Sequence, residues 1–169
     1  MNKYIATMAI LLSLPTLADE PVQVDVNGQT VSINKAHFKP ITKPFAKREV
    51  EVGYEALIDV ANFNAGSALI IESDGEVKTN WSSGNFGVTT RFYCSGTPIA
   101  MSRDFGYREQ RKSRPAKPDV EEIRFDVPHC SQLKIVVMKE GSLSRQFYTR
   151  IEQINFNVSL ASNDDQGEE

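Results

Sequence analysis

The chain has 169 residues, 40% of them hydrophobic, and a formal net charge of −3. This length suits one domain with its own core, and the acidic balance disfavours a nucleic-acid partner, which requires a strongly basic surface. With two cysteines and two histidines at no short ligand spacing, the sequence indicates neither a metal site nor a cofactor.

The first 18 residues have the pattern of a secretory signal peptide. Lys3 supplies a positive start, residues 5–14 are mostly apolar, and Ala18 is a small residue at the expected cleavage point. The apolar run is shorter than the roughly 20 residues of a membrane-spanning helix, and no later run is long enough. We therefore expect a mature protein without a transmembrane segment that is periplasmic or secreted.

Two β-hairpins are predicted in the first half of the chain. Residues 22–26 alternate in polarity up to Asn27-Gly28, a type I′ turn signal, so Val31 and Ile33 are expected to return opposite them. Residues 68–72, followed by Asp74-Gly75, predict a second hairpin. Between them, residues 50–60 carry apolar side chains at even positions and acidic ones at odd positions, which indicates a half-buried strand.

The same period of two continues to the end of the domain. Residues 86–94, 123–127 and 133–137 each place apolar side chains on one face. Residues 147–160 switch from odd to even apolar positions, so we expect a bulge near Glu152-Gln153. The polar, acidic residues 161–169 are expected to form a disordered tail.

About nine short strands without helical periodicity predict an all-β domain over residues 19–160. An antiparallel β-sandwich of jelly-roll type is the architecture we expect. Two proline-containing segments, 34–48 and 95–121, are predicted to be long loops, and loops of more than about 12–15 residues are usually functional or disordered. Both contain clusters of lysine and arginine.

The second loop combines guanidinium groups with aromatic rings, which suits an anionic partner. Its candidate ligand-binding residues are Arg103, Phe105, Tyr107, Arg108, Arg111 and Arg114. Guanidinium groups bind carboxylate or phosphate in a bidentate way, and rings add stacking area. A carbohydrate, a lipid phosphate or an acidic protein surface would be a suitable partner. The simpler alternative is that these charges are only solvated.

Trp81 and the adjacent Asn80 form a further candidate binding pair. The tryptophan could stack on a sugar ring while the asparagine hydrogen-bonds its hydroxyls. Its parity with Val77 and Thr79 favours instead a position in the core or at a sheet edge.

Cys94 and Cys130 lie at the ends of predicted strands and, in an exported chain, are expected to form a disulfide. A nucleophilic Cys130 activated by His129 is disfavoured, because catalytic Cys and His residues meet through the fold and not through adjacency.

No catalytic motif is present: the chain lacks a Gly-x-Ser-x-Gly elbow, a His-Glu-x-x-His pair and a phosphate-binding glycine loop. We therefore expect an exported, non-catalytic binding module that recognises a carbohydrate or an anionic envelope or surface component. A structural or assembly subunit of an extracytoplasmic complex is the alternative, and an unrecognised hydrolase is the third possibility.

Overall fold

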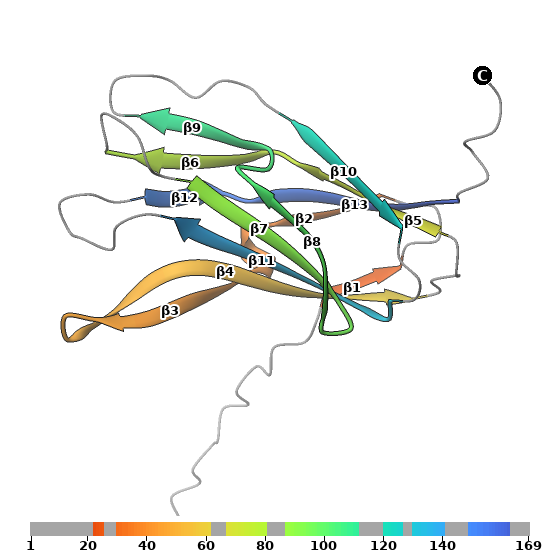
Figure 1. The fold of residues 1–169 in the computed structure, drawn as a ribbon, viewed down its shortest axis with the longest axis horizontal. Helices are drawn as coiled ribbons and strands as arrows, with labels where there is room; N and C mark the ends of the chain where they lie inside the picture. The colour runs from red at the N-terminus through yellow and green to blue at the C-terminus, as the bar shows by residue number, and fades with distance from the viewer. Residues whose placement is uncertain are drawn as a thin grey trace, which may run out of the picture.

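The computed structural model describes residues 22–25, 30–61, 67–80, 87–111, 120–126, 130–140 and 149–162. In these ranges the chain forms thirteen strands and one short 3-10 helix, η1 (Lys35–His37). Sheet A contains six strands: β1 (Val22–Asp25), β3 (Lys39–Phe45), β4 (Arg48–Ala61), β7 (Gly87–Cys94), β8 (Thr97–Arg103) and β11 (Gln132–Glu140). Their order is β1-β4-β11-β7-β8, with β3 also paired to β4 (Figure 1).

The remaining strands form two smaller sheets. Sheet B has the order β10 (Glu121–Asp126), β5 (Ser67–Ser73), β13 (Asn155–Ser162) and β2 (Val31–Asn34), and sheet C has the order β12 (Thr149–Gln153), β6 (Gly75–Thr79) and β9 (Tyr107–Arg111). One residue separates β5 from β6, and one separates β12 from β13, so both pairs of strands run from one small sheet into the other. Pairing is mostly antiparallel, except that β1 is parallel to β4 and β6 is parallel to β9.

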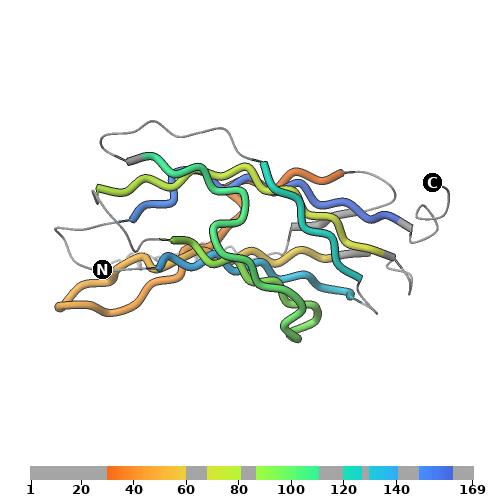
Figure 2. Tube along the Cα trace, turned by 45° about the horizontal axis from the view of Figure 1, so that its top comes forward, coloured from red at the N-terminus to blue at the C-terminus, as the bar shows by residue number. Residues whose placement is uncertain are grey.

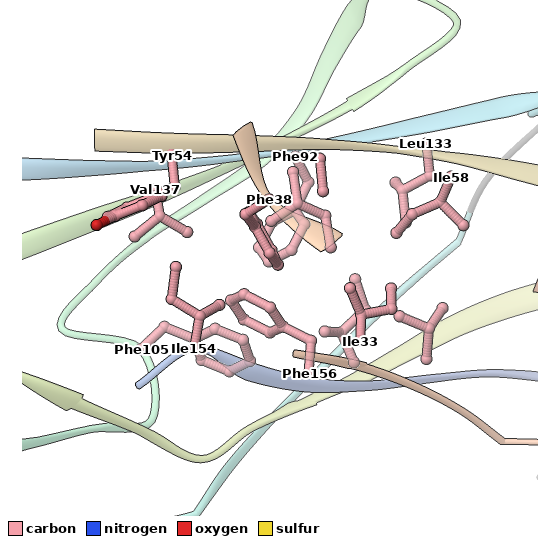
Figure 3. Packing of buried hydrophobic residues seen from close by; sticks show 14 of the residues in the cluster. Ile33, Phe38, Tyr54, Ile58, Phe92, Phe105, Leu133, Val137, Ile154 and Phe156 are labelled. Carbon is pink, nitrogen blue, oxygen red and sulfur yellow. The ribbon is translucent and has the colours of Figure 1, made fainter. Parts of the chain in front are cut away.

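The apolar core lies between sheet A and the two smaller sheets (Figure 3). Fully buried side chains face each other from both sides: Phe92, Ile58, Leu133 and Ile135 from sheet A, and Ile33, Leu69, Ile71 and Phe156 from sheet B. Removal of this apolar surface from water is the main favourable term in the folding of such a domain.

Strands predicted from alternation are confirmed where their side chains are described. In β4 the even positions Val52, Tyr54, Ala56 and Ile58 are buried, and in β11 the buried positions are Leu133, Ile135 and Val137. The expected bulge is also present, because the register of β12 against β6 shifts between Ile151 and Gln153. This shift lets Ile151 and Ile154 both reach the core.

The first predicted hairpin is wrong. β1 pairs in parallel with β4, Val22 opposite Ile58, whereas β2 pairs with β13, Ile33 opposite Phe156. The two segments therefore belong to different sheets, and long-range pairing overrides the local turn signal of Asn27-Gly28, which lies outside the described residues.

The second predicted hairpin is also wrong, because β5 and β6 run onward instead of reversing. Gly75 lacks the positive φ that a type I′ turn requires at both central residues. The amide of Asp74 donates to the carbonyl of Asn155 at 3.0 Å, so pairing with the neighbouring chain continues through the bend.

The described parts of the two predicted long loops contain mostly β-structure. Residues 34–48 contain η1 and β3, whose Pro40 and Pro44 are tolerated because β3 is an edge strand that pairs only with β4 among the described strands. Residues 95–121 contain β8 and β9, and Ser95-Gly96, both at positive φ, join β7 to β8 in a tight turn.

The signal segment 1–18 and residues 163–169 lie outside the described residues, whereas Ala161 and Ser162, predicted to be in the tail, belong to β13. In the described ranges there is no helix with the length and apolar character needed to cross a membrane.

Candidate binding surface

The first basic segment forms a hairpin that we call the arm, residues 41–51. β3 and β4 meet at a two-residue turn, Ala46-Lys47, with φ values of 48° and 65°. Two successive left-handed residues are the geometry of a type I′ turn, which normally uses Asn-Gly. The sequence gives no signal for this turn, which is why the arm was predicted to be a loop.

The arm extends beyond the rest of sheet A. β11 pairs with β4 from Asp59 to Gly53, so the portion of β4 from Arg48 to Glu51 is paired only with β3 among the described strands. In both views the hairpin runs past the ends of the adjacent described strands (Figures 1 and 2). A two-stranded ribbon of this kind can reach a partner beyond the described strands of the domain.

The strand register sorts the charges of the arm onto two faces. Because side chains alternate along a strand, and directly paired residues share a face, each face can be assigned from the pairing. We call the first the basic face, Ile41, Lys43, Phe45, Arg48 and Val50, and the second the acidic face, Thr42, Pro44, Glu49 and Glu51. Lys47 lies in the turn between them, so cations and apolar groups gather on one side.

Hydrogen bonds from the domain hold the acidic face at the root of the arm. Tyr54 Oη donates to Glu51 Oε2 at 2.5 Å, and Lys139 Nζ donates to Glu51 Oε1 at 2.6 Å. Lys35 Nζ lies 4.9 Å from the centre of the Tyr54 ring and donates to the carbonyl of Ile151 at 2.5 Å, which ties η1 to β12. These contacts fix the base from which the arm projects.

The electrostatics of this root favour an ionised Glu51. Burial opposes ionisation, but the hydrogen bonds from Lys139 and Tyr54 and the charges of Lys139 and Lys35 outweigh it, so the pKa of Glu51 lies below its ordinary value. Burial, followed by the hydrogen bond to Glu51, raises the pKa of Tyr54.

The arm's cations differ from those on the outer face of sheet A. There, Lys134 pairs with Glu55 at 2.7 Å and Arg103 pairs with Glu140 at 3.2 Å. Lys43, Lys47 and Arg48 make no ion pair with any described residue. The arm therefore offers positive charge that the carboxylates of the described residues do not neutralise.

The aromatic residues of the second basic segment lie in the core. Between β8 in sheet A and β9 in sheet C the chain crosses the molecule, with Asp104 and Gly106 at positive φ. The crossing places Phe105, 0% exposed, between Phe92 and Phe156 at ring-centre distances of 6.0 and 6.2 Å (Figure 3). Tyr107 is 7% exposed, so neither ring presents a surface for stacking.

The two arginines of this segment whose side chains are described, Arg103 and Arg108, are held by different partners on different sheets. Arg103 at the end of β8 is paired with Glu140 and lies 3.6 Å from Asp104, whereas Arg108 on β9 pairs with Asp74 at 3.0 Å and donates to Gln153 at 3.3 Å. Arg111 ends β9, opposite Thr79, and its side chain is outside the description, as is the whole of Arg114.

Of the second candidate pair, only Asn80 is described. It is half-buried and directly follows β6, while Trp81 lies outside the described residues. No group of three or more His, Cys, Asp or Glu side chains suited to a metal ion occurs in the part of the chain that the structure describes.

Cys94 and Cys130 are neighbours, but the structure has them as two buried thiols and not as a disulfide. Cys94 ends β7 opposite Leu133, and the amide of Ser95 donates to the carbonyl of Gln132 at 2.8 Å, which brings the two strand ends together. Burial, followed by the hydrogen bond and charge of Cys94, raises the pKa of Cys130 to about 12.

No protein-family model matches this sequence, and no curated protein matches it either.

Proposed function

We propose that the protein is an exported, non-catalytic binding module that recognises a carbohydrate or an anionic component of a cell envelope or surface through the basic face of the arm. The observation that carries this proposal is the register of β3 and β4, which puts Lys43 and Arg48 beside Phe45 and both carboxylates of the arm on the opposite face. The cations can bind an anionic group, and the exposed ring beside them can cover apolar surface of the partner.

The placement of the arm also supports binding. It projects from the sheet, while its root is fixed by Glu51, Tyr54 and Lys139. A preorganised element loses less conformational entropy when it binds than a flexible loop does.

The test uses the mature chain, residues 19–169, and immobilised dextran sulfate, a polyanionic glycan, with uncharged dextran as reference. We expect binding to dextran sulfate that weakens as salt is added, because exposed charges are screened over about 8 Å at physiological ionic strength. The triple variant Lys43→Ser, Lys47→Ser, Arg48→Ser should lose about tenfold to a hundredfold in affinity, since exposed ion pairs contribute about 0.2–1 kcal/mol each.

A matched control changes the same number of charges elsewhere. Lys78, Arg124 and Arg150 are exposed on β6, β10 and β12, so replacing them with Ser gives the same net charge without touching the arm. Equal losses in both triple variants would mean that only net charge matters and would contradict the proposed surface. If the triple variant Arg108→Ser, Arg111→Ser, Arg114→Ser lost all binding to dextran sulfate while the arm variant kept it, the binding site would lie in the second basic segment.

A role as an assembly subunit is the second candidate, favoured by the free edge of sheet A. In the described structure β8 pairs only with β7, and its Met101 is 68% exposed. An edge strand with an exposed apolar side chain can pair with another chain. Self-association or capture of a defined protein that Met101→Lys abolishes would support this role over the first.

We also propose that the cysteines are joined after export, when an oxidant of the export compartment accepts two electrons and two protons from the pair of thiols. The adjacency of the β7 and β11 ends supports this.

We further propose a sandwich architecture of jelly-roll type for the domain, which the position of the core between sheet A and sheets B and C supports.

A further inference from the structure

We infer that the tip of the arm binds the surface of a bilayer containing anionic phospholipids, with the ring of Phe45 entering the interface. This inference rests on the proposed function, because it names the anionic component that the same basic face recognises.

The tip has the residue arrangement that such insertion needs. Phe45 ends β3 directly before the turn and is 41% exposed, and Pro44 and Ala46 flank it. Lys43 and Lys47 enclose this short apolar stretch, and residues 39–48 contain no carboxylate. An aromatic ring at the end of a projecting hairpin can enter the interface while the body of the domain stays in water.

The cations are placed to act together with the ring. Lys43 and Arg48 share its face, and Lys47 lies in the turn. Lysine and arginine can lay their apolar stems against an apolar phase while the charged heads remain at the headgroups. The acidic residues face away, and Glu51 is already hydrogen-bonded to Tyr54 and Lys139.

The cations and the exposed ring of the tip suit a bilayer surface better than a soluble polyanion or an acidic protein surface. The cations lie on both strands and in the turn of the same tip, so they suit a laterally extended negative surface. A polysaccharide would satisfy the charges but leave the convex, aromatic tip in water. An acidic protein face would need a cavity shaped to receive Phe45.

The experiment compares co-sedimentation of the mature chain with vesicles of phosphatidylcholine alone and vesicles of phosphatidylcholine and phosphatidylglycerol. We expect binding to the anionic vesicles only. Phe45→Ser should weaken that binding by roughly tenfold, the value of partial burial of an aromatic ring, and leave dextran sulfate binding unchanged. The Lys43→Ser, Lys47→Ser, Arg48→Ser variant should lose roughly a hundredfold on anionic vesicles and also lose dextran sulfate binding.

Met101→Ser, which removes an exposed apolar side chain outside the arm, is the matched control and should bind vesicles like the unmodified chain. Lys43, Phe45, Lys47 and Met101 are exposed, whereas Arg48 is partly buried. Circular dichroism melting of each variant therefore checks that the fold is retained. Dextran sulfate binding without vesicle binding overturns the membrane inference and leaves the proposed function standing. If the protein binds neither dextran sulfate nor anionic vesicles, the membrane inference and the proposed function are both overturned. If Phe45→Ser does not weaken vesicle binding, insertion of the ring is overturned.

Discussion

Gly75 and Tyr107 are paired in register on the neighbouring parallel strands β6 and β9. A Cβ atom at position 75 would lie 2.4 Å from Cε1 of the Tyr107 ring, far inside van der Waals contact. Glycine is present here because the ring needs its space, and not because the backbone turns. Because position 75 has no side chain, the buried ring of Tyr107 can pack against the core at the point where β5 passes into β6.

Gly75→Ala should therefore destabilise the domain by about 1–3 kcal/mol, the usual cost of overpacking a well-filled site. Urea unfolding followed by circular dichroism measures the change. In a Tyr107→Ala background, where the space is open, the same substitution should cost much less. An equal cost in both backgrounds would show that the contact with the ring is not the cause.

The contacts of Glu51 predict a specific pH dependence of stability. Folding lowers the pKa of Glu51, so the unfolded chain binds a proton at this carboxylate more readily than the folded chain does. The stabilisation from Glu51 is therefore present above its ordinary pKa of 4.5. It is lost as the pH falls through the pKa of the folded state. The free energy of unfolding should decrease between neutral pH and pH values below 4.5, and Glu51→Gln should reduce that dependence. Glu49→Gln, an exposed carboxylate on the same face of the arm, should retain it.

A different residue at position 46 should make the turn at the tip of the arm more stable. Ala46 has φ 48°, and asparagine tolerates left-handed backbone better than alanine does. We expect Ala46→Asn to stabilise the arm by about 0.5–1 kcal/mol, visible as slower hydrogen exchange of its amides. Ala46→Val, which puts a β-branched side chain at the same φ, should accelerate exchange. Identical exchange in the two variants would contradict the turn geometry.

The cysteine pair predicts a redox-dependent stability. Mature protein taken from an oxidising compartment should be two hydrogens lighter than its reduced form, and oxidation should stabilise the domain by at most about 4 kcal/mol for a loop of residues 94–130. Because burial raises the pKa of Cys130 to about 12, the reduced, folded protein should react slowly with iodoacetamide at neutral pH. Two free thiols in protein from that compartment would contradict the disulfide.

The buried faces of the strands could be read from local alternation. In β11 and over residues 52–58 of β4 the predicted faces match the buried side chains, and the switch of parity between Ile151 and Ile154 correctly located a bulge. In β7 the predicted face is buried, but Thr89 of the other face is buried as well. These features depend only on which of two faces each side chain takes, a property that consecutive residues encode. The sequence favoured the second basic segment as the site because its arginines alternate with Phe105 and Tyr107, and the local pattern could not show that both rings are buried.

The sequence by itself determined an all-β chain with defined buried faces and two basic segments. Only the tertiary structure decided which strands pair, that Phe105 crosses the core instead of facing solvent, and that residues 41–51 form a projecting arm. The physical reason is that side-chain period is a local property, whereas a strand's partner is chosen by the apolar surface that distant segments bury together. Ile33 beside Phe156 is a pairing of that second kind.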